Sequence, residues 1–176
     1  MRKLIIILWF TSLFATDDNA PLQRTRDREV DIHHIKIDVA IDLESKSVSG
    51  YVIHTLSAFH SELTSFSLDA EDMEIRRARL NGKDIAFDQI GKKVYLTLNK
   101  AISWEDTVKV RLDYTAHPRK GTFFIIPDST YSEKPWQAWT QGEDTDNHHW
   151  VPLYDYPNDK ATFEVILTVD KKFKAI

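Results

Sequence analysis

The chain has 176 residues, which is long enough for one domain with a buried core. Of these residues 42% are hydrophobic and 28% are charged, a composition typical of a folded protein, so most of the chain is not expected to be disordered. The formal net charge is −4, which argues against a nucleic-acid-binding surface. The absence of cysteine excludes disulfides, thiolate metal sites and cysteine nucleophiles.

The amino terminus has the layout of a secretory signal peptide. Arg2 and Lys3 precede an apolar run over residues 4–14, which is shorter than the roughly 20 residues of a membrane-spanning helix. We therefore expect a signal peptide at 1–15, no integral membrane span, and an exported protein, periplasmic or secreted. A buried amino-terminal strand or helix is the alternative. The polar segment 16–29 is expected to be a linker.

From residue 30 onward the hydrophobic pattern has a period of two, which is typical of β-strands. Gly50 indicates a bulge or a close backbone approach inside the second strand, and Asn81-Gly82 predicts a tight hairpin with positive φ at both positions. The fold class is therefore all-β, an antiparallel β-sandwich or twisted open sheets over residues 30–176. Strands are expected at 35–43, 48–56, 63–68, 74–80, 94–98, 108–114 and 163–169.

The segment 117–158 shows little alternation apart from a short apolar run at 122–126. Loops of this length inside a compact domain usually carry function. This long loop is rich in aromatic residues, which form either a stacking platform for a ligand such as a sugar or a surface buried against a neighbouring domain. The residues in question are Trp136, Trp139, Trp150, Tyr154 and Tyr156.

One block near the carboxyl end is the most specific motif of the chain. It comprises Thr140-Gln141-Gly142-Glu143, Trp150-Val151-Pro152, Asp155, Pro157 and the run from Asp159 to Glu164. Weaker matches precede it in order: Glu29 to His34, Ser47 to Gly50, Leu80 to Gly82, Tyr114 and Gly121. Together they resemble the amino-terminal domain of the aminopeptidase N family of zinc metallopeptidases. The resemblance implies a β domain that packs on a thermolysin-type catalytic domain, with the aromatic residues at the junction.

The resemblance also implies that the loop Gln141-Gly142-Glu143 reaches into the active-site cleft. Glu143 would bind the free α-ammonium of a peptide substrate, and Gln141 would line the pocket for its first side chain. A carboxylate suits this role because its charge-assisted hydrogen bond is strong and fixes the position of the scissile bond. Gly142 would let the backbone approach the substrate without a Cβ. No catalytic residue is expected in this chain.

Zinc peptidases of this type carry an H-E-x-x-H motif, which this sequence lacks. Neighbouring residues on a strand point to opposite faces, so neither His33-His34 nor His148-His149 is expected to bind a metal. The aspartates at 144, 146, 155 and 159 do not have the spacing of a calcium loop. We therefore expect no metal or other cofactor in this chain.

The resemblance places zinc in a catalytic domain that this chain lacks, and that domain and the amino end of a peptide are the expected partners. The chain alone should be inactive, whereas the full-length protein would be a zinc metallo-aminopeptidase. A second hypothesis remains: a free-standing secreted β-sandwich that binds a ligand or a protein through its tryptophan-rich loop.

Overall fold

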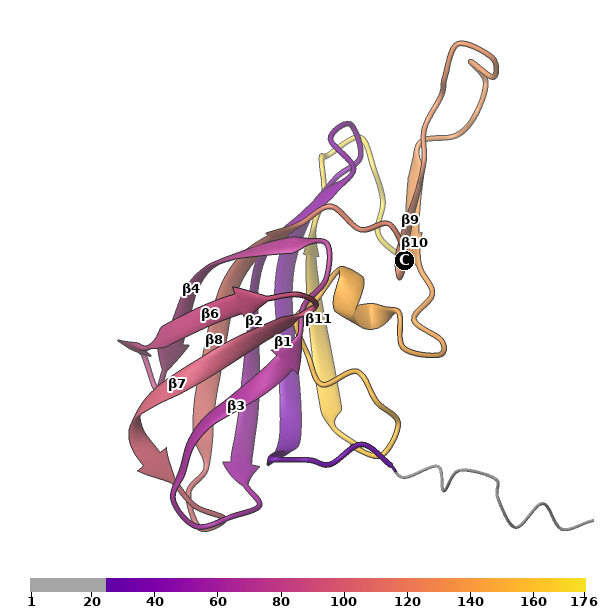
Figure 1. Cartoon of the computed structure of the whole chain (residues 1–176). Coiled ribbons are helices and arrows are strands. Elements are labelled where there is room, and N and C mark those ends of the chain that lie inside the picture. The colour runs from indigo at the N-terminus through magenta and orange to yellow at the C-terminus, as the bar shows by residue number, and fades with distance from the viewer. Residues whose placement is uncertain (1–24) are drawn as a thin grey trace, which may run out of the picture.

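The computed structural model describes residues 25–176, which contain eleven β-strands and one short 3-10 helix (Figure 1). The expected signal peptide at 1–15 and most of the expected linker at 16–29 lie outside the described residues. Within the described part, no helix is long and apolar enough to cross a membrane. The strands and the single short 3-10 helix confirm the all-β fold class for the described residues.

The larger sheet has six strands in the order β11-β1-β2-β8-β4-β5. Its antiparallel part agrees with the sequence analysis, but β11 runs parallel to β1, so the sheet is mixed. A parallel neighbour needs a long connection, and the segment between β8 and β11 supplies it. The strands are β1 (Val30–Asp42), β2 (Ser47–Ala58), β4 (Met73–Leu80), β5 (Lys83–Asp84), β8 (Val108–Ala116) and β11 (Thr162–Thr168).

The smaller sheet has three antiparallel strands in the order β3-β7-β6. It lies across one face of the larger sheet (Figure 1). The strands are β3 (Leu63–Asp69), β6 (Ala86–Ile90) and β7 (Lys93–Ile102). The segment expected to be one long loop is partly ordered: it contains a projecting hairpin of β9 (Thr122–Ile125) and β10 (Gln137–Thr140), and the 3-10 helix η1 (Asn147–His149).

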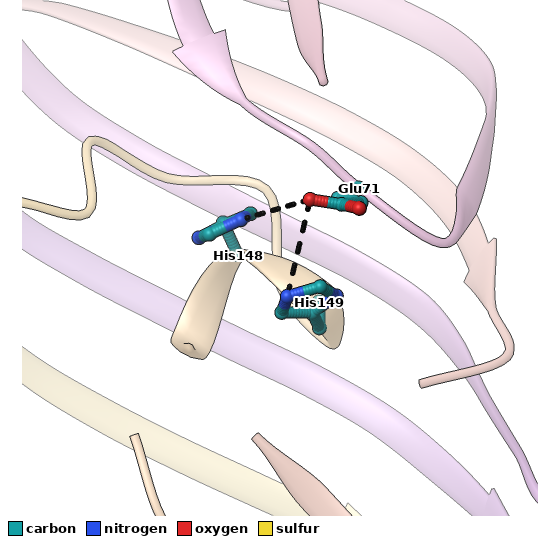
Figure 2. Close-up of side chains that lie close together, drawn as sticks. All are labelled: Glu71, His148 and His149. Atoms are coloured by element: carbon teal, nitrogen blue, oxygen red, sulfur yellow. Dashed lines mark ion pairs between the residues drawn. The ribbon is translucent and has the colours of Figure 1, made fainter. Parts of the chain in front are cut away.

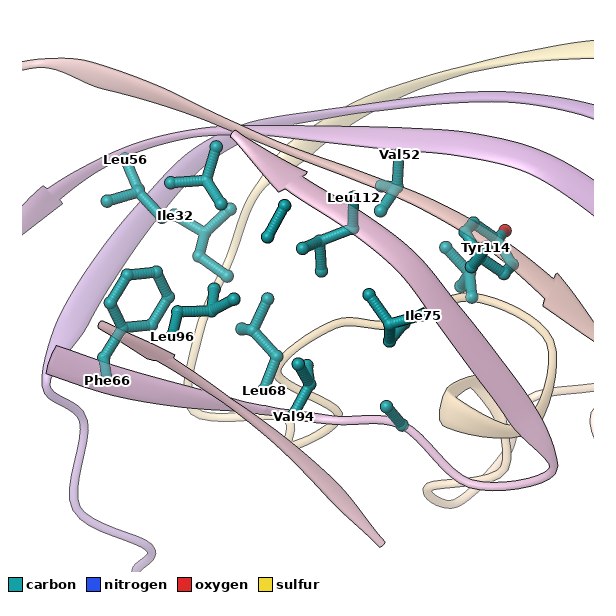
Figure 3. Packing of buried hydrophobic residues seen from close by; sticks show 14 of the residues in the cluster. Ile32, Val52, Leu56, Phe66, Leu68, Ile75, Val94, Leu96, Leu112 and Tyr114 are labelled. Atoms are coloured by element: carbon teal, nitrogen blue, oxygen red, sulfur yellow. The ribbon is translucent and has the colours of Figure 1, made fainter. Parts of the chain in front are cut away.

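The hydrophobic core fills the space between the two sheets (Figure 3). Val52, Leu112 and Tyr114 enter it from the larger sheet, and Leu68 and Leu96 enter it from the smaller one. All five are fully buried, and along β7 and β8 buried residues alternate with more exposed ones. This alternation is the physical origin of the period-two pattern in the sequence.

Two local predictions from glycine positions can be compared with the backbone. Asn81 and Gly82 have φ of 48° and 84° and join β4 to β5, which confirms the predicted hairpin. At Gly50 the close approach is confirmed, since an added Cβ would lie 2.2 Å from the carbonyl oxygen of Asp38. The irregularity in the pairing of β1 with β2 lies elsewhere, between Ile32 and His34.

Candidate substrate-binding loop and histidine cluster

The loop that carries Gln141, Gly142 and Glu143 begins directly after β10. The backbone N–H of Gln141 donates to the carbonyl of Gly121 at 2.9 Å, and the carbonyl of Gly142 accepts from the N–H of Asp146 at 3.0 Å. These two bonds close a turn with Glu143 exposed on it. No described residue forms an ion pair or a side-chain hydrogen bond with the Glu143 carboxylate.

Two glycines give this turn its shape. A Cβ on Gly142 would lie 2.1 Å from Oδ1 of Asn147, and a Cβ on Gly121, whose φ is +71°, would lie 2.0 Å from the carbonyl oxygen of Asp146. Asn147 is held in that place because its Nδ2 donates to the Gly142 carbonyl and to Oδ1 of Asp155, each at 3.4 Å. Gly142 is therefore favoured by packing within the domain, because a Cβ at this position would force the Asn147 side chain to move.

The segment that follows the loop is anchored to the core. Trp150 and Val151 are buried, and Asp69 and Leu153 form a β-bridge with backbone hydrogen bonds of 2.8 and 3.1 Å. The Nε2–H of His54, on β2, donates to the Pro152 carbonyl at 2.8 Å. The loop is thus carried by a rigid base.

His54 is the most deeply buried titratable group on that base. Its side chain has no exposed surface, and burial lowers its pKa to about 4. No described residue offers its Nδ1 a hydrogen-bond partner. The ring is therefore neutral at pH 7, with its single proton on Nε2.

The aromatic residues of the long loop do not form one surface. Trp150 is buried, and Tyr154 is half-buried with its hydroxyl donating to the carbonyl of Arg26 at 3.2 Å. Trp136 and Trp139 are exposed at the β9–β10 hairpin, where Trp139 stacks on Phe123 with ring centroids 4.6 Å apart. A platform built from all five aromatic residues is thus not formed.

The rule that neighbours on a strand point to opposite faces does not apply to His148 and His149, because these loop residues occupy η1. In this helix the two rings stack on each other, with centroids 4.5 Å apart. Their Nε2 atoms lie 3.5 and 3.9 Å from Oε2 of Glu71 (Figure 2). By contrast, His33 and His34 form hydrogen bonds with two different hydroxyl groups, those of Ser57 and Thr162.

Glu71 belongs to the connection between β3 and β4, and nothing in the sequence pattern pointed to it. Its backbone N–H donates to the carbonyl of His148 at 3.0 Å, which fixes the connection against η1. The hydrogen bond from Lys92 is the main cause that lowers the pKa of Glu71, so its carboxylate is ionised at neutral pH. The hydrogen bond to Asp155 raises the pKa of His148.

The outermost strand, β11, is exposed along its whole length. Four of its apolar side chains are more than 40% exposed, and Phe163 reaches 72%. No described strand pairs with its outer edge. A strand of this kind is the sort of surface that another domain or chain covers. The four are Phe163, Val165, Ile166 and Leu167.

Comparison with known proteins gives one consistent family. The model of the peptidase M1 N-terminal domain matches residues 31–176. Leukotriene A-4 hydrolase of Xenopus laevis is 22% identical over 152 residues, which are 82% of this chain and 25% of that protein. Leucyl aminopeptidase of Saccharolobus solfataricus is 31% identical over 109 residues, which are 62% of this chain and 13% of that protein.

Solved structures agree with the sequence matches. The M1 zinc metallopeptidase of Deinococcus radiodurans superimposes with a TM-score of 0.67 at 26% identity, over 81% of this chain and 33% of that one. Yeast leukotriene A4 hydrolase shares the fold, with a TM-score of 0.66 at 16% identity over 80% of this chain and 23% of that one. The chain thus spans a quarter or less of these curated relatives.

Proposed function

This chain belongs to the peptidase M1 N-terminal domain family, and we propose that it is the non-catalytic amino-terminal domain of an exported zinc aminopeptidase, to which it supplies the anchor for the substrate's α-amine. Export rests on the signal-like residues 1–15. The anchor rests on the loop Gln141-Gly142-Glu143. The observation that carries it is the exposed Glu143 carboxylate, which pairs with none of the residues 25–176, on a turn held by backbone hydrogen bonds.

An exopeptidase has to distinguish a terminal ammonium from an internal amide. A carboxylate does so because it accepts a charge-assisted hydrogen bond from the ammonium, about twice as strong as a neutral one. Glu143 is available for such a bond because none of the described residues neutralises it. The hydrogen bonds of Gln141 and Gly142 hold the backbone on both sides, so little conformational entropy remains to be lost when a substrate binds.

The ligands of similar structures fit this chemistry. Mutants of M1 zinc metallopeptidases similar to this chain have been solved with a Tyr-Ser-Ala substrate and with L-arginine, at 26% and 25% identity to this chain. Both ligands present a free α-ammonium. The same group is the proposed partner of Glu143, with Gln141 beside it as part of the pocket for the first side chain.

Zinc, which these relatives use, would be bound by a catalytic domain, since the H-E-x-x-H motif does not occur in this sequence. That domain would also cover the exposed apolar side chains of β11. The residues of this chain would bind and orient the peptide, whereas polarisation of the scissile carbonyl would come from the metal. The 176-residue chain alone is expected to release no amino acids from peptides.

The test uses the complete gene product with its catalytic domain. Glu143→Gln should lower kcat/KM for an aminoacyl-anilide by about 10- to 100-fold, which corresponds to loss of a hydrogen bond to a charged group. Asp144→Asn is the matched control, because it removes the same charge from the next exposed residue and should leave kcat/KM unchanged. Equal effects of the two substitutions would show that Glu143 does not bind the amine.

A further inference from the structure

We propose that Glu71, His148 and His149 form a binding site for a divalent transition-metal ion of the zinc class. The three side chains come from two segments that are distant in the sequence, the β3–β4 connection and η1. One potential ligand atom of each lies within 4.8 Å of the other two. Figure 2 shows both histidine rings facing the Glu71 carboxylate, with the ion-pair lines from each ring ending there.

The distances are close to those of a zinc site. Tetrahedral zinc binds histidine nitrogen and carboxylate oxygen at about 2.0–2.2 Å, which places neighbouring ligand atoms about 3.3–3.5 Å apart. The Nε2 of His148 lies 3.5 Å from Oε2 of Glu71, and the Nε2 of His149 lies 3.9 Å from the same oxygen. The nitrogen–oxygen distances exceed those of a zinc site by at most about 0.6 Å. The two histidine nitrogens lie within 4.8 Å of each other, so they would have to approach by up to about 1.5 Å.

The other ring nitrogens favour metal binding. Nδ1 of His148 lies 2.9 Å from Oδ2 of Asp155, and Nδ1 of His149 lies 2.7 Å from Oδ2 of Asp72. A carboxylate only accepts hydrogen bonds, so each Nδ1 carries a proton, and a neutral ring then presents the lone pair of its Nε2 to Glu71. Carboxylates placed behind metal-binding histidines in this way orient the rings and raise their basicity.

A cation at the centre would stabilise this arrangement. Two nitrogen lone pairs and a carboxylate oxygen that face each other repel, unless a proton or a metal ion lies between them. Among the described residues, the ammonium of Lys92 pairs with this carboxylate, its Nζ lying 2.8 Å from Oε2 of Glu71. The side chain of Lys92 is 74% exposed, so it can move into solvent when a metal ion binds.

A fourth ligand is within reach. Oδ1 of Asp146 lies 3.9 Å from Nε2 of His149. Its present partner, Nζ of Lys120, is 3.4 Å away on a side chain that is 61% exposed. Two imidazoles with one or two carboxylates are a ligand set that suits zinc and similar ions. The His149 side chain is 6% exposed, so the site is sheltered from bulk water.

The test uses the 176-residue chain, stripped with a chelator and titrated with zinc chloride by calorimetry at neutral pH. We expect one ion per chain, and a rise in melting temperature of about 5 °C or more at zinc concentrations one hundred times the Kd. His148→Gln, His149→Gln and Glu71→Gln should each weaken binding by at least about 10-fold. His60→Gln, at an exposed histidine outside the cluster, should bind as the unaltered chain does.

Two further measurements keep the proposal testable if a variant fails to fold. In the unaltered chain, zinc should shift the ring nitrogen resonances of two histidines only, 148 and 149, in long-range proton–nitrogen spectra. Lys92→Met removes the competing ammonium and should raise zinc affinity, whereas a cluster held only by ion pairs would lose stability and gain no affinity. Absence of saturable binding, or shifts confined to His33 and His34, would overturn the proposal.

Discussion

The buried histidine on β2 makes the stability of this domain depend on pH in a way that one substitution should remove. His54 has no exposed surface, its Nε2–H donates to the Pro152 carbonyl, and burial lowers its pKa from 6.5 to about 4. As pH falls through 6.5 the unfolded chain takes up a proton, while the folded chain stays neutral down to pH 4. Stability is therefore fully present above pH 6.5 and is lost between 6.5 and 4.

The magnitude follows from the difference between the two pKa values. One unit corresponds to 1.36 kcal/mol, so the full loss is about 3.4 kcal/mol below pH 4, and about 2 kcal/mol is already lost at pH 5. His54→Gln cannot titrate, and its side-chain amide can still donate to the Pro152 carbonyl. The variant should be less stable at pH 7.5, because packing is altered, and the difference should shrink by about 2 kcal/mol at pH 5.

The assay is urea unfolding followed by tryptophan fluorescence at pH 7.5, 6 and 5. Other groups also titrate in this range, so the quantity to compare is the difference between the unaltered chain and His54→Gln, with His60→Gln as the control at an exposed histidine. If the free energies of unfolding of the unaltered chain and of His54→Gln stay parallel from pH 7.5 to 5, the low pKa of His54 is refuted.

Two further substitutions test the packing around the loop and in the core, each by urea unfolding. Gly121→Ala should cost about 3 kcal/mol, because the new Cβ would meet the Asp146 carbonyl, whereas Gly91→Ala, with φ of +61° and open space around it, should cost only about 1 kcal/mol. Equal costs would contradict the close contact. Tyr114→Phe should raise stability by about 1 kcal/mol, since the buried hydroxyl has no partner among the described residues. A loss of stability would show that the hydroxyl is bonded.

Apart from β11, which is exposed along its whole length, the strands that the sequence predicted contribute side chains to the core. Val108 to Tyr114 alternates because β8 lies in the middle of the larger sheet with one face on the core. β6 was missed because nearly all of it is exposed, so its residues carry no burial pattern. The parallel pairing of β11 could not be predicted either, since an isolated strand carries no sign of its neighbour's direction.

The candidate sites differ in how far the sequence could reveal them. The family resemblance was found from motifs that are local in the sequence, and the family model confirms it. The role of Glu143 remains a prediction. The histidine cluster could not be predicted, because Glu71 and His148 are distant in the sequence and because His148 and His149 lie in a 3-10 helix, where neighbouring side chains do not alternate as on a strand.

The two proposed sites share a support, and this determines which substitution can separate them. Asp155 accepts from Asn147, which holds the Gly142 carbonyl, and also from His148. Any change at Asp155 should therefore disturb both the amine anchor and the metal site. Glu71 lies on a different segment, the β3–β4 connection, so Glu71→Gln should weaken zinc binding by at least about 10-fold while Glu143 stays in place. The loop's function and the metal site can thus fail independently, which means that neither proposal depends on the other.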